Sequence, residues 1–452
     1  MDWSRKVQQR RIGATSWGVL SAVFLASAVV AIASAGPVWA NTGMENVAYG
    51  AKSAGMGGTS IAVGDDATVM NTNPASISRT LGGRIDMNME VMFPMFSFQN
   101  PLNDTAGNHP VYPIPSAGLV YHSHGSRWSF GIGMFNEGGT GTDYGKLAVD
   151  NDVLGPSIGL TRVRYFSQFG YMKLTPTVAL EISDGISVGV SPQLGYSRMK
   201  MEMPFFEPSM NRFWAAQMEA DSPSVGVKVG LLYRVSDRYG VGVAYSSTTD
   251  IRLKGDLYMA TPTGDLPGMP KRSVMKGDLE MDMGWPQSLK FGGFVKLQTL
   301  GGMVVASDVE WLDWSHYYGE IPLRMREVTL NGRRQPARSF TMGTGWADQW
   351  VFKLGLEYPV TERFRIRGGY VYGKNPAKSE GALAVMNPFV EHHLTAGVGY
   401  DLSRRVELNG SVVYGLNKTL SVGRYHPFAP DMMNSRTGME FVSLSLMLSY
   451  KW

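Results

Sequence analysis

The chain has 452 residues, no cysteine and a formal net charge of +4 at pH 7. The lack of cysteine excludes a disulfide framework. Four basic residues and one acidic residue near the start carry +3 of that charge, so the rest of the chain is close to neutral and gives no argument for nucleic-acid binding. Glycine is abundant and regular helical periodicity is scarce, which favours one large all-β body over several soluble domains.

The first forty residues have the pattern of a secretory signal. A basic start, MDWSRKVQQRR, precedes an apolar run over residues 18–35 and the small-residue site Val38-Trp39-Ala40. This pattern predicts cleavage after Ala40. A transmembrane anchor is the alternative, but the run is short and ends in a cleavage-like site. We therefore expect residues 1–40 to be a cleaved signal peptide and the protein to be exported.

Residues 41–82 lack the alternation of a strand. The stretch from Gly55 to Ala75, GMGGTSIAVGDDATVMNTNPA, is rich in small residues and ends in an Asn-Pro-Ala turn. We expect this segment to be a hatch, a plug held inside a barrel that residues 83–452 form.

From Arg84 to the C-terminus, apolar and polar residues alternate in repeated stretches, as in strands with one apolar face. In the last stretch, Val442, Leu444 and Leu446 alternate with serines. Fourteen strands are predicted, at 84–93, 116–123, 127–136, 171–182, 186–198, 223–235, 239–249, 287–297, 302–314, 349–360, 364–373, 392–401, 405–415 and 440–452.

The connections between these strands alternate between short and long. The short ones lie at 124–126, 183–185, 236–238, 361–363 and 402–404, and the long ones near 94–115, 137–170, 199–222, 250–286, 315–348, 374–391 and 416–439. Bacterial outer-membrane barrels combine an even strand number with short periplasmic turns and long external loops. A soluble β-sandwich would explain the alternation alone. The loop rhythm and the signal favour an all-β, 14-stranded antiparallel transmembrane β-barrel with the hatch inside the lumen.

Three segments resemble a known family. Gly57–Ile77, Trp346–Pro376 and His392–Trp452 are similar to the hatch and the C-terminal third of the FadL/TodX (OmpP1) family of outer-membrane transporters for hydrophobic compounds. The resemblance implies a monomer in the bacterial outer membrane that contacts lipid and lipopolysaccharide and is inserted by the barrel-assembly machinery. It also implies ligand capture at external loops, an internal pocket and lateral exit at a kink in the third strand. The gating residues implied are Asn73, Pro74, Ala75, Gly138 and Gly139.

The long connection after residue 198 is a candidate for ligand capture. Exposed apolar patches often mark binding sites, and methionine adapts to ligands of varied shape. The predicted capture residues are Met201, Met203, Phe205, Phe206, Met210, Phe213 and Trp214, with Tyr258 from the next long connection. Packing of a loop against its neighbours explains the same residues. Arg198, Lys200 and Arg212 are candidates to hold a carboxylate.

Motifs for other chemistry are missing from the sequence. The seven histidines are scattered, and no metal-ligand spacing, phosphate loop or nucleotide fingerprint occurs. We therefore expect no cofactor, no metal and no enzymatic activity, although a lipolytic barrel remains an alternative. The predicted function is passive uptake of hydrophobic molecules such as long-chain fatty acids or aromatic and aliphatic hydrocarbons. The alternative is a general diffusion porin, or a structural or adhesive barrel, with the N-terminal segment outside the lumen.

Overall fold

The computed structural model describes residues 42–80, 82–108, 111–150, 160–207, 212–261, 273–386 and 390–452. The predicted signal peptide, residues 1–40, lies outside the described residues. No helix in the described ranges has the length and apolar character needed to cross a membrane.

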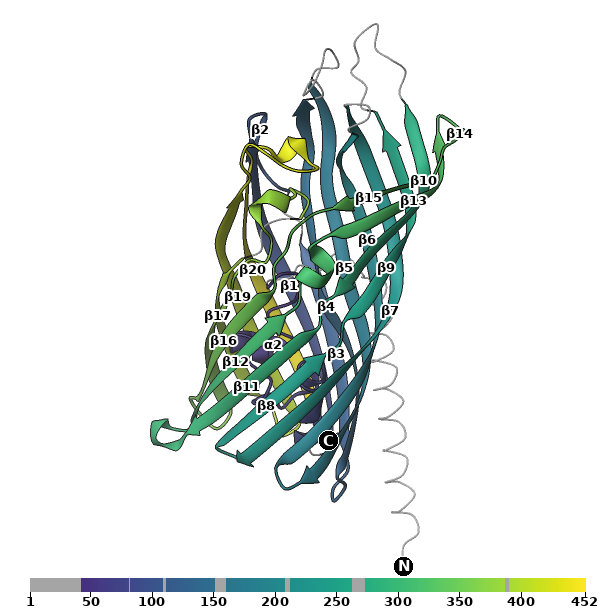
Figure 1. The fold of residues 1–452 in the computed structure, drawn as a ribbon. Helices are drawn as coiled ribbons and strands as arrows, with labels where there is room; N and C mark the ends of the chain where they lie inside the picture. The colour runs from purple at the N-terminus through teal and green to yellow at the C-terminus, as the bar shows by residue number, and fades with distance from the viewer. Residues whose placement is uncertain are drawn as a thin grey trace, which may run out of the picture. The chain divides into compact units, whose positions relative to one another are not determined.

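Most of the described residues are in β-strands (Figure 1). The first ten strand segments are β1 (Gly82–Asn100), β2 (Asn103–Ala106), β3 (Tyr112–His122), β4 (Trp128–Asp150), β5 (Leu160–Ser183), β6 (Ile186–Glu207), β7 (Arg212–Ser236), β8 (Tyr239–Ser246), β9 (Thr249–Ala260) and β10 (Val274–Trp285). They are followed by β11 (Ser288–Leu297), β12 (Met303–Leu312), β13 (Ile321–Leu330), β14 (Arg333–Arg334), β15 (Arg338–Met342), β16 (Gln349–Pro359), β17 (Phe364–Gly373), β18 (His392–Asp401), β19 (Val406–Ser421) and β20 (Arg436–Lys451).

The helical segments are short. Two are α-helical, α2 (Ala51–Gly55) and α3 (Ser315–Tyr318). The others are 3-10 turns: η1 (Ala67–Asn71), η2 (Pro74–Arg79), η3 (Gln298–Leu300), η4 (Ser379–Gly381) and η5 (Pro430–Met432).

The sheet closes on itself because β1 pairs with β3 on one side and with β20 on the other. Four wall strands each consist of two segments in line, namely β8 with β9, β10 with β11, β12 with β13, and β15 with β16. With these joined, the described residues form a closed 14-stranded antiparallel barrel. The predicted fold class is confirmed, and each predicted strand corresponds to one strand of the wall.

The prediction of long loops at 137–170, 199–222 and 250–286 is wrong for most of their described residues, because 137–150, 160–170, 199–207, 212–222, 250–260 and 274–285 lie in strands. β6 and β7 stay paired from Ile186 opposite Tyr233 to Glu207 opposite Arg212, and β9 pairs with β10 beyond the predicted strand ends. These extensions were missed because their polarity is reversed. In β7, Val229 faces outward near the short turns, whereas Glu219 faces outward further along.

We call the part of the barrel near the short turns the hatch half and the part near the long connections the chamber half. Between them, β8 and β9 are separated by Ser247 and Thr248. Lys228 of β7 lies opposite Ser246 of β8, and Asp221 of β7 lies opposite Lys254 of β9. Between these two pairs, the strand formed by β8 and β9 therefore has one residue more than β7. One extra residue turns the following side chains to the other face of a strand.

Residues 42–80 lie inside the hatch half (Figure 1). Helix α2 packs against β17, β18, β19 and β20, whereas η1 packs against β1, β3, β4 and β5, and η2 against β4, β5, β6 and β7. The segment therefore contacts the wall on several sides of the lumen, and nearly all of its residues are buried. We keep the name hatch for residues 42–80.

Candidate functional site

The wall of the hatch half binds the backbone of the hatch. The Asp308 carboxylate accepts hydrogen bonds from the amides of Ser60 and Ile61, at 2.8 and 3.1 Å. On another side of the barrel, the Asp86 carboxylate accepts from the amide of Ala67 at 2.6 Å. A Cβ would collide with the hatch at several inward-facing wall glycines, which include Gly189, Gly242, Gly355 and Gly369. Small and polar wall residues therefore admit the hatch and fix it in place.

Buried ion pairs join the start of the hatch to the wall. Lys290 pairs with Glu45 of the hatch and, at 3.5 Å, with Glu310. Glu310 pairs with Lys353 at 2.8 Å, and Lys353 donates to the Val47 carbonyl at 3.0 Å. All four charged side chains are buried. Removal of one of them would leave an uncompensated charge in the lumen.

A further acid of the hatch, Asp66, lies at the start of η1. Its carboxylate accepts a hydrogen bond from the Thr68 amide at 2.8 Å and so caps the helical turn. Burial, together with the nearby Asp86 carboxylate, raises the pKa of Asp66 to about 6. This group therefore gains charge within the range of ordinary solution pH.

β4 bends into the lumen near Gly138. Its register with β5 shifts between Asn136 and Gly138, and residues 133–142 are buried on both faces of the strand. A Cβ at Gly138 would overlap the Met44 carbonyl oxygen, to which the Gly139 amide donates at 3.0 Å. The bend lies where the sequence analysis expected the third-strand kink. The start of the hatch pairs with it.

Asn71 is one of three hatch side chains that reach this kink, with Asn46 and Tyr49. The Asn71 amide donates to the Glu137 carboxylate at 2.7 Å, and Glu137 forms an ion pair with Lys173, also at 2.7 Å. Both carboxylate and ammonium are buried. Sequence reasoning did not pair Asn71 with Glu137. The available signal was an acid directly before a glycine pair in a stretch of small residues.

Of the gating residues that the resemblance implies, Asn73 makes its hydrogen bonds away from the kinked strand. The Asn73 amide donates to the Ile61 and Leu231 carbonyls, at 2.8 and 3.1 Å, and its oxygen accepts from the Ala75 amide. Pro74 begins the separate turn η2, which faces β6 and β7. Asn73, Pro74 and Ala75 therefore lie together, but away from Gly138 and Gly139.

The hydrogen-bonded wall is broken beside the kink. The last pair between β3 and β4 is Ala117 with Met134. β3 continues to Tyr112 and stays paired with β1 on its other side, but within its described residues 112–116 it has no pairing with β4. Further along, the segment before β3 contacts β4 again. The Asn108 amide donates to the Asp143 carbonyl at 2.7 Å, and the Asn103 side chain binds the backbone of Ala148 through both its groups, at 2.8 and 2.9 Å. We call the interval from the Ala117–Met134 pair to the Asn108–Asp143 contact the lateral break.

The chamber half encloses an apolar cavity of about 230 Å³. Its lining comes from β6, β7, β9, β10, β13 and β15 and from the start of η5 with the segment before it, and Thr341 is the one polar side chain among the lining residues described. The lining residues that sequence reasoning missed include Leu279, Leu323 and Phe340. They come from strands far apart in the chain, so no local pattern brings them together.

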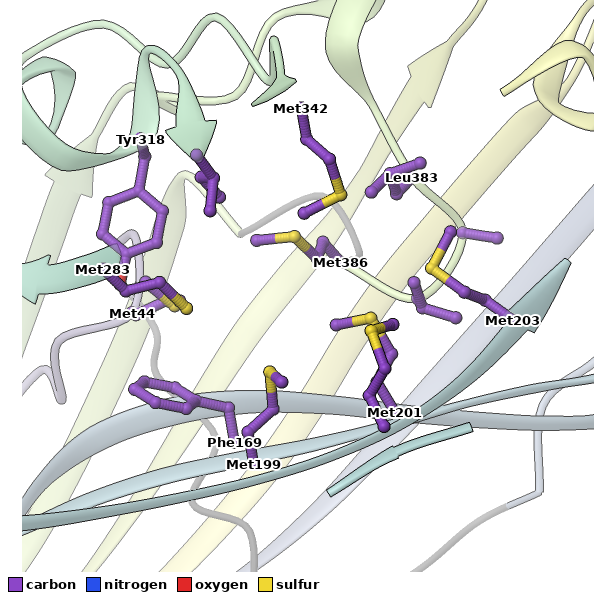
Figure 2. Packing of buried hydrophobic residues seen from close by; sticks show 14 of the residues in the cluster. Met44, Phe169, Met199, Met201, Met203, Met283, Tyr318, Met342, Leu383 and Met386 are labelled. Carbon is purple, nitrogen blue, oxygen red and sulfur yellow. The ribbon is translucent and has the colours of Figure 1, made fainter. Parts of the chain in front are cut away.

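A smaller space of about 20 Å³ lies next to this cavity, and Met342 lines both. Figure 2 shows Met201, Met283 and Met342 of the wall and Met386 of the connection between β17 and β18 pointing into one cluster. Thr140, two residues beyond Gly138, also lines the smaller space. An apolar lining therefore extends from the cavity to the kinked strand. Because methionine side chains are flexible, this narrow part can adapt to a guest molecule.

The predicted capture residues that the structure describes lie on strands and not in an external loop. Met203, Phe205 and Phe206 line the cavity from β6, and Met201 lines the smaller space. On β7, Trp214 is buried opposite Phe205, and the ring of Phe213 lies 5.2 Å from that of Phe206. The apolar residues face inward, so they form the chamber and not an exposed patch.

Other predicted binding residues lie elsewhere. Tyr258 is on the opposite face of β9, with the Lys276 ammonium 5.8 Å from its ring centre. Arg198 pairs with Glu219 on the outer surface and does not line the cavity. Lys200 is likewise exposed. Met210 and the Arg212 side chain lie outside the described residues. In the described part of the chain, no three His, Cys, Asp or Glu side chains form a group suited to a metal ion.

Residues 27–426 match the family described as outer membrane protein transport protein (OMPP1/FadL/TodX). The chain belongs to this family. It is therefore an outer-membrane protein of a family of transporters and channels for hydrophobic molecules, and not of a family of enzymes. A 47 kDa outer membrane protein of Pasteurella multocida is 22% identical over 344 residues, which are 72% of this chain and 75% of that protein.

Solved structures show the same fold. The Pseudomonas putida toluene transporter TodX matches with a TM-score of 0.73 and 18% identity, over 90% of this chain and 99% of that chain. A Pseudomonas aeruginosa FadL homologue matches with a TM-score of 0.70 and 14% identity, over 92% of this chain and 99% of that one. At these identities, the likeness supports the barrel architecture alone.

Proposed function

We propose that this protein carries uncharged hydrophobic molecules through the outer membrane by passive diffusion. A molecule enters the apolar cavity, passes between the methionines around Met342 and leaves through the lateral break into the membrane. The observation that carries this proposal is the apolar lining that runs from the cavity to Thr140, beside the kink of β4. The hatch obstructs the axial route and holds the kink.

The route suits an apolar cargo. A hydrophobic molecule gains about 25 cal/mol for each Å² that it removes from water, so a water-filled axial pore offers it little. The obstacle is the polar outer layer of the membrane. A cavity that takes up the molecule outside this layer and releases it sideways into hydrocarbon avoids both the headgroups and the aqueous lumen.

The cavity favours small neutral molecules as cargo. A cavity of about 150 Å³ is large enough to bind benzene, and this one measures about 230 Å³. No charged side chain is among its described lining residues, so a fatty-acid carboxylate would have no paired cation there. TodX is a toluene transporter, and a single-ring hydrocarbon fits the dimensions here. We therefore propose single-ring and comparably small hydrocarbons as the substrate class.

The transport unit is one chain. The hatch, the cavity and the lateral break all belong to a single barrel, so a monomer surrounded by lipid and lipopolysaccharide contains the whole route. The porin alternative requires an N-terminal segment outside the lumen. It loses support because residues 42–80 bind the wall from within.

Uptake of labelled toluene, oleate and glucose tests the proposal. Cells that lack the protein are compared with cells that produce it, at equal amounts of folded protein in the outer membrane. We expect accelerated toluene uptake and no acceleration for oleate or glucose. A preference for oleate would assign fatty acids as the cargo, and faster glucose entry would show a diffusion porin.

A further inference from the structure

The edge of β3 along the lateral break contains two prolines, Pro113 and Pro115. The direction of their backbone nitrogens follows from hydrogen bonds at the other end of the neighbouring strand. In an antiparallel pair, successive residues direct their main-chain groups to opposite neighbours. Gly83 and Trp452 exchange both backbone hydrogen bonds, each 3.0 Å long. Odd-numbered residues of β1 therefore point to β20, and even-numbered residues point to β3.

The register carries this assignment across to β3. Arg84 lies opposite Val120, and the pairing continues without a shift to Met92 opposite Tyr112. Even-numbered residues of β3 therefore direct their main-chain groups to β1, and odd-numbered residues direct them to β4. Pro113 and Pro115 are both odd, so their nitrogens face the lateral break. A proline nitrogen has no hydrogen to donate.

The positions that the prolines would face are the kinked ones. Continuing the register beyond Ala117 and Met134 would place Asn136 opposite Pro115, and Gly138 opposite Pro113. The Asn136 carbonyl, which a regular barrel would pair with β3, accepts instead from the Asn46 side chain of the hatch at 2.9 Å. β3 thus lacks two backbone N–H donors, and the Asn46 side chain of the hatch already binds one of the backbone carbonyls of β4 that would accept from them.

We propose that Pro113 and Pro115 keep the lateral break open by denying β4 the two N–H groups needed to pair with β3 above Ala117. This inference rests on the lateral route proposed above. Two physical effects act together. The prolines prevent the strands from closing into a continuous ladder, as edge prolines do elsewhere. They also remove two N–H groups that would otherwise face hydrocarbon without a partner, which is costly in a membrane.

Replacing both prolines by alanine restores the donors. In the variant P113A/P115A, we expect β3 and β4 to pair further, and toluene uptake to fall by at least about fivefold, because two backbone hydrogen bonds then favour the closed wall. The matched control is P192A/P223A, which changes two exposed prolines of β6 and β7 away from the break. We expect the control to transport as the parent chain does.

A disulfide trap reports closure directly, because the chain has no cysteine of its own. Ser116→Cys and Phe135→Cys would lie opposite one another if pairing extended one residue beyond Ala117 and Met134. Under mild oxidation, we expect the pair to cross-link at least about tenfold faster in the P113A/P115A background than with both prolines present. Heat-dependent mobility on gels verifies that each variant is folded.

The outcomes separate this inference from the proposed function. If cross-linking is no faster in the alanine background, the inference is overturned, whether or not uptake falls. If uptake stays unchanged while cross-linking is faster, the prolines do not control the route, and the inference again fails. If the parent chain, fully cross-linked with a short bifunctional thiol reagent at the same cysteine pair, still takes up toluene normally, the lateral route itself is refuted.

Discussion

The hatch half and the chamber half place polar and apolar side chains in opposite ways. Near the short turns of β7, Val229 and Leu231 face outward with 43% and 42% of their surface exposed, while Lys228 is buried against the hatch. Further along the same strand, Glu219 faces outward and Met218 faces the cavity. The medium beyond each face explains the difference. Lipid surrounds the hatch half and water surrounds the chamber half.

This contrast shows that the polarity of the outward side chains depends on the medium around the barrel. An apolar face of a strand therefore does not by itself identify the outer surface. The hatch half is stabilised by paired charges and by hydrogen bonds to the hatch. The chamber half is stabilised inside by apolar burial and outside by exposed ion pairs, such as Arg252 with Asp282 at 3.2 Å. The same type of substitution should therefore have different effects in the two halves.

The largest expected effect is the loss of a buried charge in the hatch half. Lys290→Met leaves Glu45 and Glu310 without this partner, and we expect the free energy of unfolding to fall by about 3–5 kcal/mol. Urea unfolding from lipid vesicles, followed by tryptophan fluorescence, measures the change. The control Arg252→Met in the chamber half should cost less than about 1 kcal/mol, because this exposed pair is solvated. Equal costs would contradict the contrast between the halves.

Adding a charge to the chamber should strongly reduce transport. Met259→Glu places a carboxylate among the apolar residues of the cavity, and we expect toluene uptake to fall at least about tenfold because the buried charge has no partner. Tyr258→Glu is the matched control, since Tyr258 lies on the opposite face of β9. Uptake assays at equal protein levels compare the two. Similar losses in both variants would show that the cavity face does not bind the cargo.

A change at Asp66 tests the cost of a buried acid in the hatch. The folded-state pKa of about 6 exceeds the unfolded value of about 3.9, so folding takes up a proton between these values. Wild-type stability should therefore decrease as pH rises from about 4 to about 6 and then level off. Asp66→Asn keeps a capping oxygen without this titration, and we expect it to gain about 1–3 kcal/mol over wild type above pH 6. Unfolding at pH 4 and pH 7.5 measures the difference, and an equal gain at both values would disprove the assignment.

Gly138→Ala should loosen the start of the hatch. The new methyl group would collide with the Met44 carbonyl, and we expect the hydrogen bond from the Gly139 amide to weaken by about 1–2 kcal/mol. Hydrogen exchange at Gly139 reports this local loss. The control Gly293→Ala adds a methyl group whose nearest neighbour lies at 3.6 Å. If Gly139 exchanges at the same rate in both variants, the kink does not depend on this contact.

The smallest effect is expected from a conservative change in the chamber. Met203→Leu nearly conserves volume, so stability should change by less than about 1.5 kcal/mol. The flexible thioether adapts to different guests, whereas leucine has fewer shapes available. We therefore expect the range of hydrocarbons taken up to narrow while toluene uptake stays within about twofold. Competition between toluene and bulkier hydrocarbons measures this range, and an unchanged range would assign no adaptive role to Met203.

The sequence was sufficient to predict the hatch half of the wall. There, each strand alternates between lipid-facing and lumen-facing residues, as in Val442 to Leu446, and the short turns separate the strands clearly. The family resemblance also pointed to Gly138 and Gly139, next to which the register of β4 with β5 shifts. These features are local, so adjacent residues carry the signal.

The chamber and the hatch contacts could not be predicted in the same way. Leu257 and Met259 belong to a strand in which buried apolar residues alternate with polar outward residues. A lipid-facing strand would have apolar outward residues, so this stretch was interpreted as a loop. The choice between Asn71 and Asn73 depends on where the turns η1 and η2 begin. The two side chains lie two positions apart, and one faces the kink while the other faces β7. Only the closed barrel brings these distant partners together.

The extra residue at Ser247 and Thr248 restricts how this barrel can be re-engineered. Deleting one of the two would rotate β9 by half a period, which would present Ile251 and Leu253 to water and turn Arg252 toward the ligand. A chimera that borrows the outer portion of another transporter must therefore conserve the odd–even parity of this junction. Substrate range can be exchanged by swapping the portion above the junction, provided that the swap includes it.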